Sequence, residues 1–173
     1  MTNLLKKIWL DVFYRRLNTE NWARKKGAKV GKNCRLLNIT FSSEPYLVEI
    51  GDHVSATSVH FETHDGGIWV FRDKHRSWDI IKPIKIGNNV YLGLDVIVLP
   101  GVTIGDNVVV GARSIVTKDI PANSVVAGIP ARVIKSIDEY YEKVKQDVKD
   151  TKLMRSSDKK KFYLNYFKQW QKD

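Results

Sequence analysis

The chain has 173 residues, of which 43% are hydrophobic, and this suits one domain with a sizeable core and excludes a disordered chain. The formal net charge of +10 lies wholly at the two ends, because residues 30–134 carry ten basic and ten acidic residues. A nucleic-acid-binding module carries its basic face on the folded body, so the neutral centre argues against nucleic acid as the partner.

Residues 1–27 are predicted to form an amphipathic helical segment. Apolar side chains recur there at helical intervals, at Leu5, Ile8, Trp9, Val12, Phe13 and Leu17. Charges interrupt the pattern, and no apolar run in the chain approaches the roughly 18 residues of a spanning helix, so we expect neither a signal peptide nor a membrane span. Two roles are open to this segment: it caps one end of the domain, which we favour, or it makes peripheral contact with an anionic membrane.

Cys34 is the only cysteine, so the chain has no internal disulfide and no CxxC metal or redox pair. We expect it to be a small buried residue rather than a catalytic thiol. A reducing, cytoplasmic location fits this cysteine usage, at the inner face of the membrane if the N-terminal helix binds lipid.

Residues 28–134 are predicted to form an all-β solenoid built from six-residue repeats. Aliphatic residues recur every six positions, at Ile86, Leu92, Val98, Ile104, Val110 and Val116. A second small or apolar residue stands two positions before each next member, at Val90, Val96, Val102, Val108, Ser114 and Ile120. A spacing of two puts both residues on one face of a strand, so each repeat supplies a short strand with two inward side chains. Glycine follows four of the lead residues, where we expect tight corners to require it.

Earlier repeats are weaker. One begins at Val30 and another at Ile50, and these are twenty residues apart, so residues 38–46 are expected to absorb a two-residue slip. Residues 66–83 contain two tryptophans and many charges and do not follow the repeat, so we expect a loop that leaves the solenoid.

Residues 135–173 are predicted to be a C-terminal helical tail. Apolar residues fall at helical intervals in residues 137–148 and again in residues 162–170, with a polar linker at residues 150–161. These helices are also expected to cap the solenoid, whose ends otherwise expose strand edges.

The repeat resembles a known family. The motifs IGNNVYLG at residues 86–93, PGVTIGD at 100–106, VGARSIVTKD at 110–119 and AGIPARVIK at 127–135 are similar to those of the hexapeptide-repeat acyltransferases, in their sugar and polysaccharide O-acetyltransferase branch. The resemblance covers about residues 28–142. It implies a left-handed parallel β-helix with flanking helices, a homotrimer with active sites between subunits, and acetyl-CoA as cosubstrate with no metal.

His64 is the candidate general base. A sugar hydroxyl is a poor nucleophile at neutral pH, and histidine has the most suitable pKa for removing its proton. His64 stands where the repeats stop and the loop begins, and it matches the Thr-His-Asp-Gly-Gly motif of the resembled branch. By contrast, we expect His53 to be a solvated turn residue, His60 to be packed on a strand, and His75 to be exposed in the loop.

The other site residues are assigned with alternatives. Glu62, Asp65 or a backbone carbonyl orients the base, and Glu62 lies on the same face as His64 by strand alternation. The resemblance implies that backbone N–H groups at Gly93 and Leu94 stabilise the oxyanion. Acetyl-CoA is expected to contact Tyr91, Gly111, Ala112, Thr117, Lys118, Arg132 and Lys135, although the basic residues among them also suit ordinary surface charge. In the loop, Trp69, Phe71, Arg72, Arg76 and Trp78 are expected to grip a saccharide acceptor, to form a trimer contact, or both.

The leading hypothesis is an acetyl-CoA-dependent O-acetyltransferase acting on a sugar or polysaccharide unit. N-acetylation of an amino-sugar nucleotide is the alternative within the same family, and a non-catalytic trimeric scaffold is a weaker one. A zinc enzyme of the carbonic-anhydrase kind needs three converging histidines, and the spacings of His53, His60 and His64 do not match the repeat.

Overall fold

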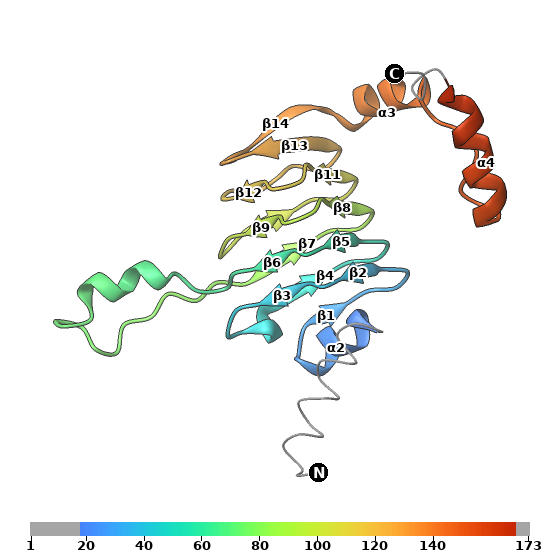
Figure 1. Ribbon diagram of the computed structural model, residues 1–173. Coiled ribbons are helices and arrows are strands. Elements are labelled where there is room, and N and C mark those ends of the chain that lie inside the picture. The colour runs from blue at the N-terminus through green and yellow to red at the C-terminus, as the bar shows by residue number, and fades with distance from the viewer. Residues whose placement is uncertain (1–17, 169–173) are drawn as a thin grey trace, which may run out of the picture. The chain divides into compact units, whose positions relative to one another are not determined.

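The computed structural model describes residues 18–168. Residues 1–17 of the helical segment predicted at residues 1–27, and residues 169–173 of the predicted tail, lie outside the described residues. The chain divides into two compact units, the first ending at Tyr140 and the second beginning at Tyr141. The first unit contains the solenoid (Figure 1).

Twelve strands form four coils, each with one strand in each of three parallel sheets (Figure 1). The first two coils contain β1 (Lys29–Val30), β2 (Arg35–Leu37), β3 (Thr40–Phe41), β4 (Val48–Ile50), β5 (Ser55–Thr57) and β6 (His60–Phe61). The next two contain β7 (Ile84–Ile86), β8 (Val90–Leu92), β9 (Ile97–Val98), β10 (Thr103–Ile104), β11 (Val108–Val110) and β12 (Ile115–Val116). Sheet A is β1-β4-β7-β10, sheet C is β3-β6-β9-β12, and sheet B is β2-β5-β8-β11, extended by two further strands.

The inward residues of the repeat form the core, as the sequence predicted. Both predicted series are buried throughout, with relative exposures between 0% and 6%. The third and fourth coils are in register with a repeat of eighteen residues, since Val90 lies beside Val108 and Ile86 beside Ile104. The predicted β-helix of hexapeptide repeats is therefore confirmed.

The glycines that follow the lead residues have a different role from the predicted one. Positive φ angles occur instead two positions later, for example at Asn89 (53°) and Asn107 (56°), while Gly93 is not among the residues with positive φ. A Cβ atom added at Gly93 would lie 2.6 Å from the backbone nitrogen of Ala112 on the next coil. These glycines therefore allow close stacking of successive coils, and the residue two positions later, asparagine in two of the four repeats, adopts the left-handed turn.

The left-handed turn residues form a ladder along one corner. The Nδ2 group of Asn89 donates to Oδ1 of Asn107, and that of Asn107 donates to Oδ1 of Asn123, each at 2.9 Å. His53 extends the ladder, with Nδ1 2.9 Å from Oδ1 of Asn89. His53 is exposed in a turn, as expected from the sequence.

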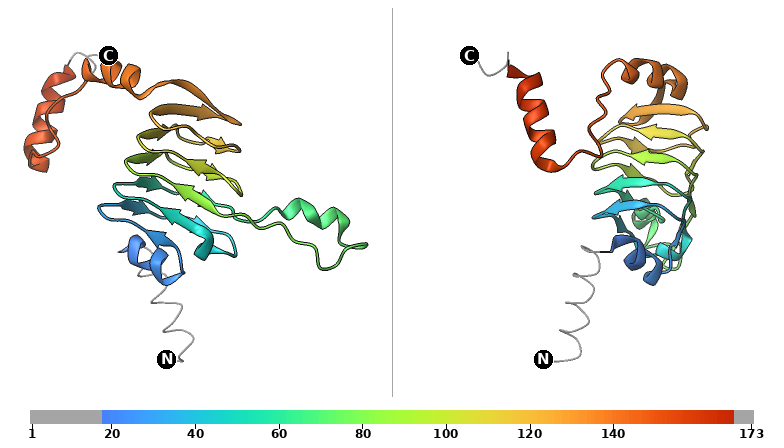
Figure 2. Two further views of the ribbon diagram at one scale, coloured as in Figure 1. Left: turned by 180° about the vertical axis from the view of Figure 1, so that it is seen from behind. Right: turned by 90° about the vertical axis from the view of Figure 1, so that its right-hand side faces the viewer.

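Two irregularities interrupt the coils. The 3-10 helix η1 (Pro45–Leu47) lies between β3 and β4 and accommodates the predicted slip, because Leu36 pairs with Ala56 twenty residues on. The predicted loop leaves after β6, contains the 3-10 helix η2 (Gly66–Phe71), and projects away from the coils (Figure 2). At its base the N–H of Lys82 donates to the carbonyl of Thr63 at 2.8 Å.

The helix α2 (Thr19–Lys25) caps the first coil. Trp22 is buried and stacks on Phe41 with ring centroids 5.6 Å apart. Oε1 of Glu20 accepts from the N–H of Leu36 at 3.1 Å, and Arg24 donates to the carbonyls of Val30 and Gly31. Polar groups on the exposed strand edge are thereby paired, which is what a capping element must do.

The last coil ends in an antiparallel pair, β13 (Ser124–Gly128) and β14 (Ala131–Ser136), followed by α3 (Ile137–Lys145). The second unit contains α4 (Ser156–Tyr166), whose aromatic rings contact one another. The predicted linker at residues 150–161 is therefore too long, since the helix begins at Ser156. Among residues 18–168, no helix is long and apolar enough to span a membrane.

Candidate active site

His64 lies at the corner where the loop leaves β6, which we call the His64 corner (residues 61–65 with residues 42–44). Its imidazole is 35% exposed and faces a pocket of about 450 Å³. The pocket is lined by Glu62, His64, Asp65, Gly66, Ile80, Lys82, Leu99, Pro100 and Thr117. An imidazole at the wall of an open pocket is placed to exchange a proton with a bound molecule.

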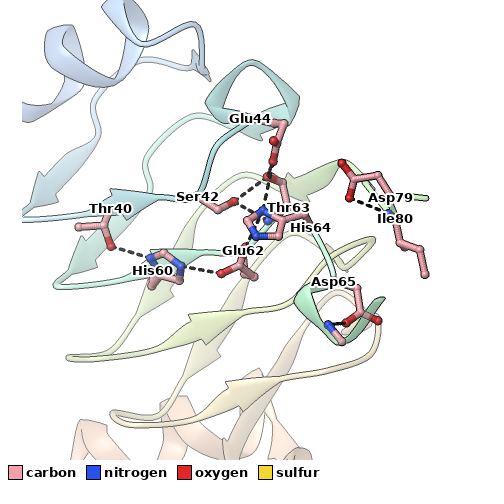
Figure 3. A network of polar contacts seen from close by, with 11 residues as sticks. Thr40, Ser42, Glu44, His60, Glu62, Thr63, His64, Asp65, Asp79 and Ile80 are labelled. Atoms are coloured by element: carbon pink, nitrogen blue, oxygen red, sulfur yellow. Dashed lines mark hydrogen bonds and ion pairs between the residues drawn. The ribbon is translucent and has the colours of Figure 1, made fainter. Parts of the chain in front are cut away.

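Two carboxylates approach the same ring nitrogen of His64 (Figure 3). Nδ1 is 3.2 Å from Oε1 of Glu62 and 3.4 Å from Oε2 of Glu44. Nδ1 and Oε1 of Glu62 are buried, and neither contact has the alignment of a hydrogen bond. Because Nδ1 faces the carboxylates, Nε2 is the nitrogen that remains to take a proton from a ligand.

The local chain explains this arrangement. Residues 62 and 64 alternate onto one face after β6, while Thr63 points the other way and is fully buried. The Thr63 hydroxyl donates to Oε2 of Glu44 at 2.6 Å, and the Thr63 N–H donates to Oγ of Ser42 at 2.8 Å. Thr63 therefore ties the second coil to the corner of the first coil, which carries Glu44.

A second histidine contacts Glu62. Nε2 of His60 is 3.1 Å from Oε2 of Glu62, and Nδ1 of His60 is 2.8 Å from Oγ1 of Thr40 (Figure 3). Burial acts to raise the pKa of Glu62, but hydrogen bonding from His60 and the Ser42 hydroxyl and the nearby charge of His64 outweigh it, so the pKa is lowered. Glu62 is consequently an ionised group that bridges two imidazoles.

Asp65, the other carboxylate that the sequence offered for orienting the base, has another partner. Its Oδ1 accepts from the N–H of Gly67 at 2.9 Å and caps η2. Figure 3 shows Asp65 turned away from the ring of His64.

Sequence reasoning missed Glu44 and the contact made by His60. Glu44 precedes Thr63 by nineteen residues, close to the twenty-residue length of the first coil, so stacking the two coils on paper would have brought them together. His60 was expected to be packed on its strand, and it is half-buried on β6 beside Thr40 of β3.

Gly93 and Leu94 lie at the opposite end of sheet C from His64. They form what we call the Gly93 corner (residues 93–95), which precedes β9, whereas the His64 corner follows β6. The N–H of Gly93 donates to the carbonyl of Val110 at 2.9 Å. Leu94 is different, because its N–H donates to no group within residues 18–168, and its side chain is exposed. One chain therefore does not bring these residues to His64.

The residues predicted to contact acetyl-CoA lie at several separate places on one chain. Gly111 and Ala112 stack on the Gly93 corner. Tyr91 is exposed on β8 and lines a separate groove. Thr117 lines the His64 pocket with exposed Lys118 beside it in sequence, and Arg132 and Lys135 lie on β14.

Four of the predicted loop residues are exposed on the projecting arm, and Arg72 is half-buried. Trp69 is 73% exposed and Phe71 51% exposed. Trp78 stacks on His75 with ring centroids 3.4 Å apart, and Nη1 of Arg72 donates to the carbonyls of Arg76 and Trp78. Arg72 therefore holds the arm in shape, while the large exposed aromatic rings are available to a second surface.

Two other kinds of site, a catalytic thiol at Cys34 and a metal centre, find no support in the structure. Cys34 is half-buried, its Sγ lies 3.3 Å from the carbonyl of Gly51, and burial raises the pKa of its thiol. A raised pKa lowers the thiolate fraction and makes Cys34 a poor nucleophile. Within residues 18–168, no group of three or more histidine, cysteine or acidic side chains is arranged to hold a metal ion.

Known proteins are similar to this chain in sequence and in fold. Residues 83–118 match the family model described as bacterial transferase hexapeptide (six repeats). Protein CapG of Staphylococcus aureus is 50% identical over 169 residues, which cover 95% of this chain and 98% of CapG. A crystal structure of a maltose O-acetyltransferase from Clostridium difficile 630 is 32% identical with a TM-score of 0.56, over 78% of this chain and 89% of that chain.

A structure of a galactoside acetyltransferase in complex with coenzyme A is also similar. It is 34% identical with a TM-score of 0.55, over 71% of this chain and 72% of that chain. The solenoid is thus a left-handed parallel β-helix with flanking helices. The chain belongs to the hexapeptide-repeat acetyltransferase family, in its sugar O-acetyltransferase branch.

Proposed function

We propose that this protein transfers an acetyl group from acetyl-CoA to a hydroxyl of a sugar or polysaccharide unit, with residues 28–134 as the catalytic domain. His64 is the general base. The observation that carries this proposal is the placement of Nδ1 of His64 beside Glu62, at 3.2 Å, in the wall of an open pocket. Nε2 then accepts the substrate proton, and Glu62 orients the ring.

The reaction has two steps. The acceptor oxygen attacks the thioester carbonyl carbon while Nε2 of His64 removes the hydroxyl proton, and the carbonyl oxygen becomes an oxyanion. The oxyanion then re-forms the carbonyl, the C–S bond breaks, and the departing sulfur takes the proton from Nε2. The ionised carboxylate of Glu62 stabilises the imidazolium that exists between the steps.

The complete site is proposed to lie between subunits of a homotrimer. The two corners at the ends of sheet C carry complementary halves, so a second copy that places its Gly93 corner against the His64 pocket completes the site. In that arrangement the Leu94 N–H is the oxyanion donor, because the Gly93 N–H already donates to Val110. The exposed rings of Trp69, Phe71 and Trp78 then contact the acceptor or the neighbouring subunit.

Coenzyme A in the similar galactoside acetyltransferase structure supports acetyl-CoA as the cosubstrate. We propose that the arm of acetyl-CoA follows Tyr91, Gly111 and Ala112 and passes Thr117. Lys118, Arg132 and Lys135 are proposed to bind its phosphates, since guanidinium and ammonium groups suit that task. Arg76 is exposed and is left for the acceptor.

Incubation of the purified protein with labelled acetyl-CoA and either maltose, methyl galactoside or glucosamine tests the reaction. Label on a hydroxyl supports the proposal, whereas label only on the amine of glucosamine supports the alternative N-acetyltransferase. A folded protein that does not bind acetyl-CoA in calorimetry would instead be a scaffold. Binding of the full chain to anionic vesicles tests the proposed peripheral membrane contact separately.

A further inference from the structure

The side chain of Glu44 is only 12% exposed, although a carboxylate is costly to bury without partners. Its Oε2 accepts from the Thr63 hydroxyl at 2.6 Å and lies 3.4 Å from Nδ1 of His64. The first contact is a strong hydrogen bond by its length, and the second is the only ion-pair contact of Glu44 within residues 18–168. The two partners explain how a carboxylate persists at this depth.

The hydroxyl group of Thr63 links Glu44 to the second coil. A carboxylate only accepts hydrogen bonds, so Thr63 donates to Glu44, and the Ser42 hydroxyl lies 2.6 Å from the Thr63 oxygen on its other side. Ser42 in turn accepts the Thr63 N–H. The short hydrogen bond from Thr63 fixes the Glu44 carboxylate at the position where it faces His64.

Two carboxylates at one ring nitrogen suit a cation better than a neutral ring. A neutral imidazole has a single N–H and fully satisfies one acceptor, whereas an imidazolium is attracted by both charges. Neither contact at Nδ1 has the alignment of a hydrogen bond, as expected for a ring held between the two acceptors. The charge of the imidazolium appears when His64 removes the substrate proton, so the arrangement stabilises the transition state more than the resting state.

The two carboxylates are not equivalent. Glu62 is shared, because Oε2 faces His60 and Oε1 faces His64. Within the described part of the chain, Glu44 makes its ion-pair contact with His64 alone. The other charged groups that line the pocket are Asp65, which caps η2, and Lys82, which lies on the segment by which the loop returns to β7.

We propose that Glu44 is a positioning residue that acts with Glu62 to stabilise the imidazolium form of His64 during proton transfer. This inference rests on the proposed role of His64 as the general base. It assigns the first coil a part in the reaction through Glu44, which is nineteen positions upstream of its hydrogen-bond partner Thr63.

The sharpest test measures His64 directly and needs no substrate. In the full chain labelled with 15N-histidine, the NMR titrations of the four imidazoles are separable by single substitutions. In Glu44→Gln, the midpoint of the His64 titration is expected to move about one pH unit lower than in the wild type, a tenfold loss of proton affinity. The control Glu49→Gln removes an exposed carboxylate that pairs with Lys29 on sheet A, and should leave the midpoint unchanged.

A midpoint that stays in place in folded Glu44→Gln would overturn the proposal. If Glu44→Gln does not fold, Glu44→Asp keeps the charge and draws it back from Nδ1, so a smaller shift in the same direction is expected. A purely structural role for Glu44 predicts lower thermal stability in either variant without any movement of the His64 titration.

Steady-state kinetics provide the second test, with maltose or methyl galactoside as the probe acceptor. Glu44→Gln should lower kcat about tenfold, leave both KM values unchanged, and move the acid limb of the kcat/KM profile to lower pH. A changed NMR midpoint with wild-type kcat would show that Glu44 tunes His64 while the proposed base is wrong. An unchanged midpoint in an active enzyme would leave the proposed function intact and remove Glu44 from it.

Discussion

The two corners at the ends of sheet C are built in opposite ways. The His64 corner interrupts the repeat and gathers ionisable side chains, with Glu62 between two histidines and Glu44 reaching in from the previous coil. The Gly93 corner keeps the repeat and offers backbone and small side chains packed closely between coils. In this solenoid, the proposed proton-transfer groups lie where the repeat is broken, and the proposed backbone oxyanion donor lies where the repeat is kept.

Replacing His64 is expected to have the largest effect. His64→Ala removes the proposed base, and acetyl transfer to the probe acceptors should fall about 1,000-fold, within the usual range for general base catalysis. His53→Asn is the matched control, because asparagine is the usual residue at that position of the ladder. Steady-state rates measure both, and a His64→Ala variant with full activity would refute the mechanism.

The Gly93 corner is tested by steric change. In Gly93→Ala, the new Cβ would lie 2.6 Å from a backbone nitrogen of the next coil, so unfolding should become easier by about 1–3 kcal/mol. Gly66→Ala is the control, since a Cβ there meets nothing within 4 Å. Urea denaturation measures the difference, and equal stability of the two variants would contradict the stacking role of Gly93.

Glu62→Gln tests the His64 corner through pH. The folded-state pKa of Glu62 lies below the ordinary value of 4.5, so its ionised form stabilises the fold above that pH and the contribution is lost as the pH falls through the lowered value. The variant should therefore be less stable than wild type at pH 7 and approach it in acid, with activity about tenfold lower. Thermal melts between pH 3 and 7 check this, and a constant difference would speak against it.

The asparagine ladder should give the smallest effect. Asn107→Ala removes two side-chain hydrogen bonds at a residue with φ of 56°, and a loss of about 1–2 kcal/mol is expected. Asn107→Gly removes the same bonds but tolerates the backbone angle, so its loss should be smaller. Chemical denaturation separates the two, and equal losses would mean that the left-handed turn carries no strain.

The predictable part of the molecule is the part that repeats. Val98 and Val110 could be placed in the core from their spacing alone, because the third and fourth coils keep one eighteen-residue register. Strand alternation also placed Glu62 on the same face as His64, although Asp65 and a backbone carbonyl stayed open as alternatives for orienting the ring. Both inferences use only neighbours in sequence.

The unpredicted features depend on contacts between coils of unequal length. Glu44 contacts His64 because the two residues are twenty positions apart, which is the length of the irregular first coil, whereas the regular repeat gives eighteen. The glycine corners were misread because backbone contact between coils resembles turn chemistry in sequence. The separation of Gly93 from His64 required knowing which end of sheet C each one occupies.

The base of the projecting arm has a consequence for how such proteins diversify. Thr63 and Lys82 are joined by a backbone hydrogen bond of 2.8 Å, and β4 and β7 on either side of the excursion pair in register. The arm therefore begins and ends at nearly the same point and adds nothing to the pitch of the coils. An arm of different length or composition can be grafted at these two residues, so the proposed acceptor-binding arm can change while the contacts of the His64 corner stay the same.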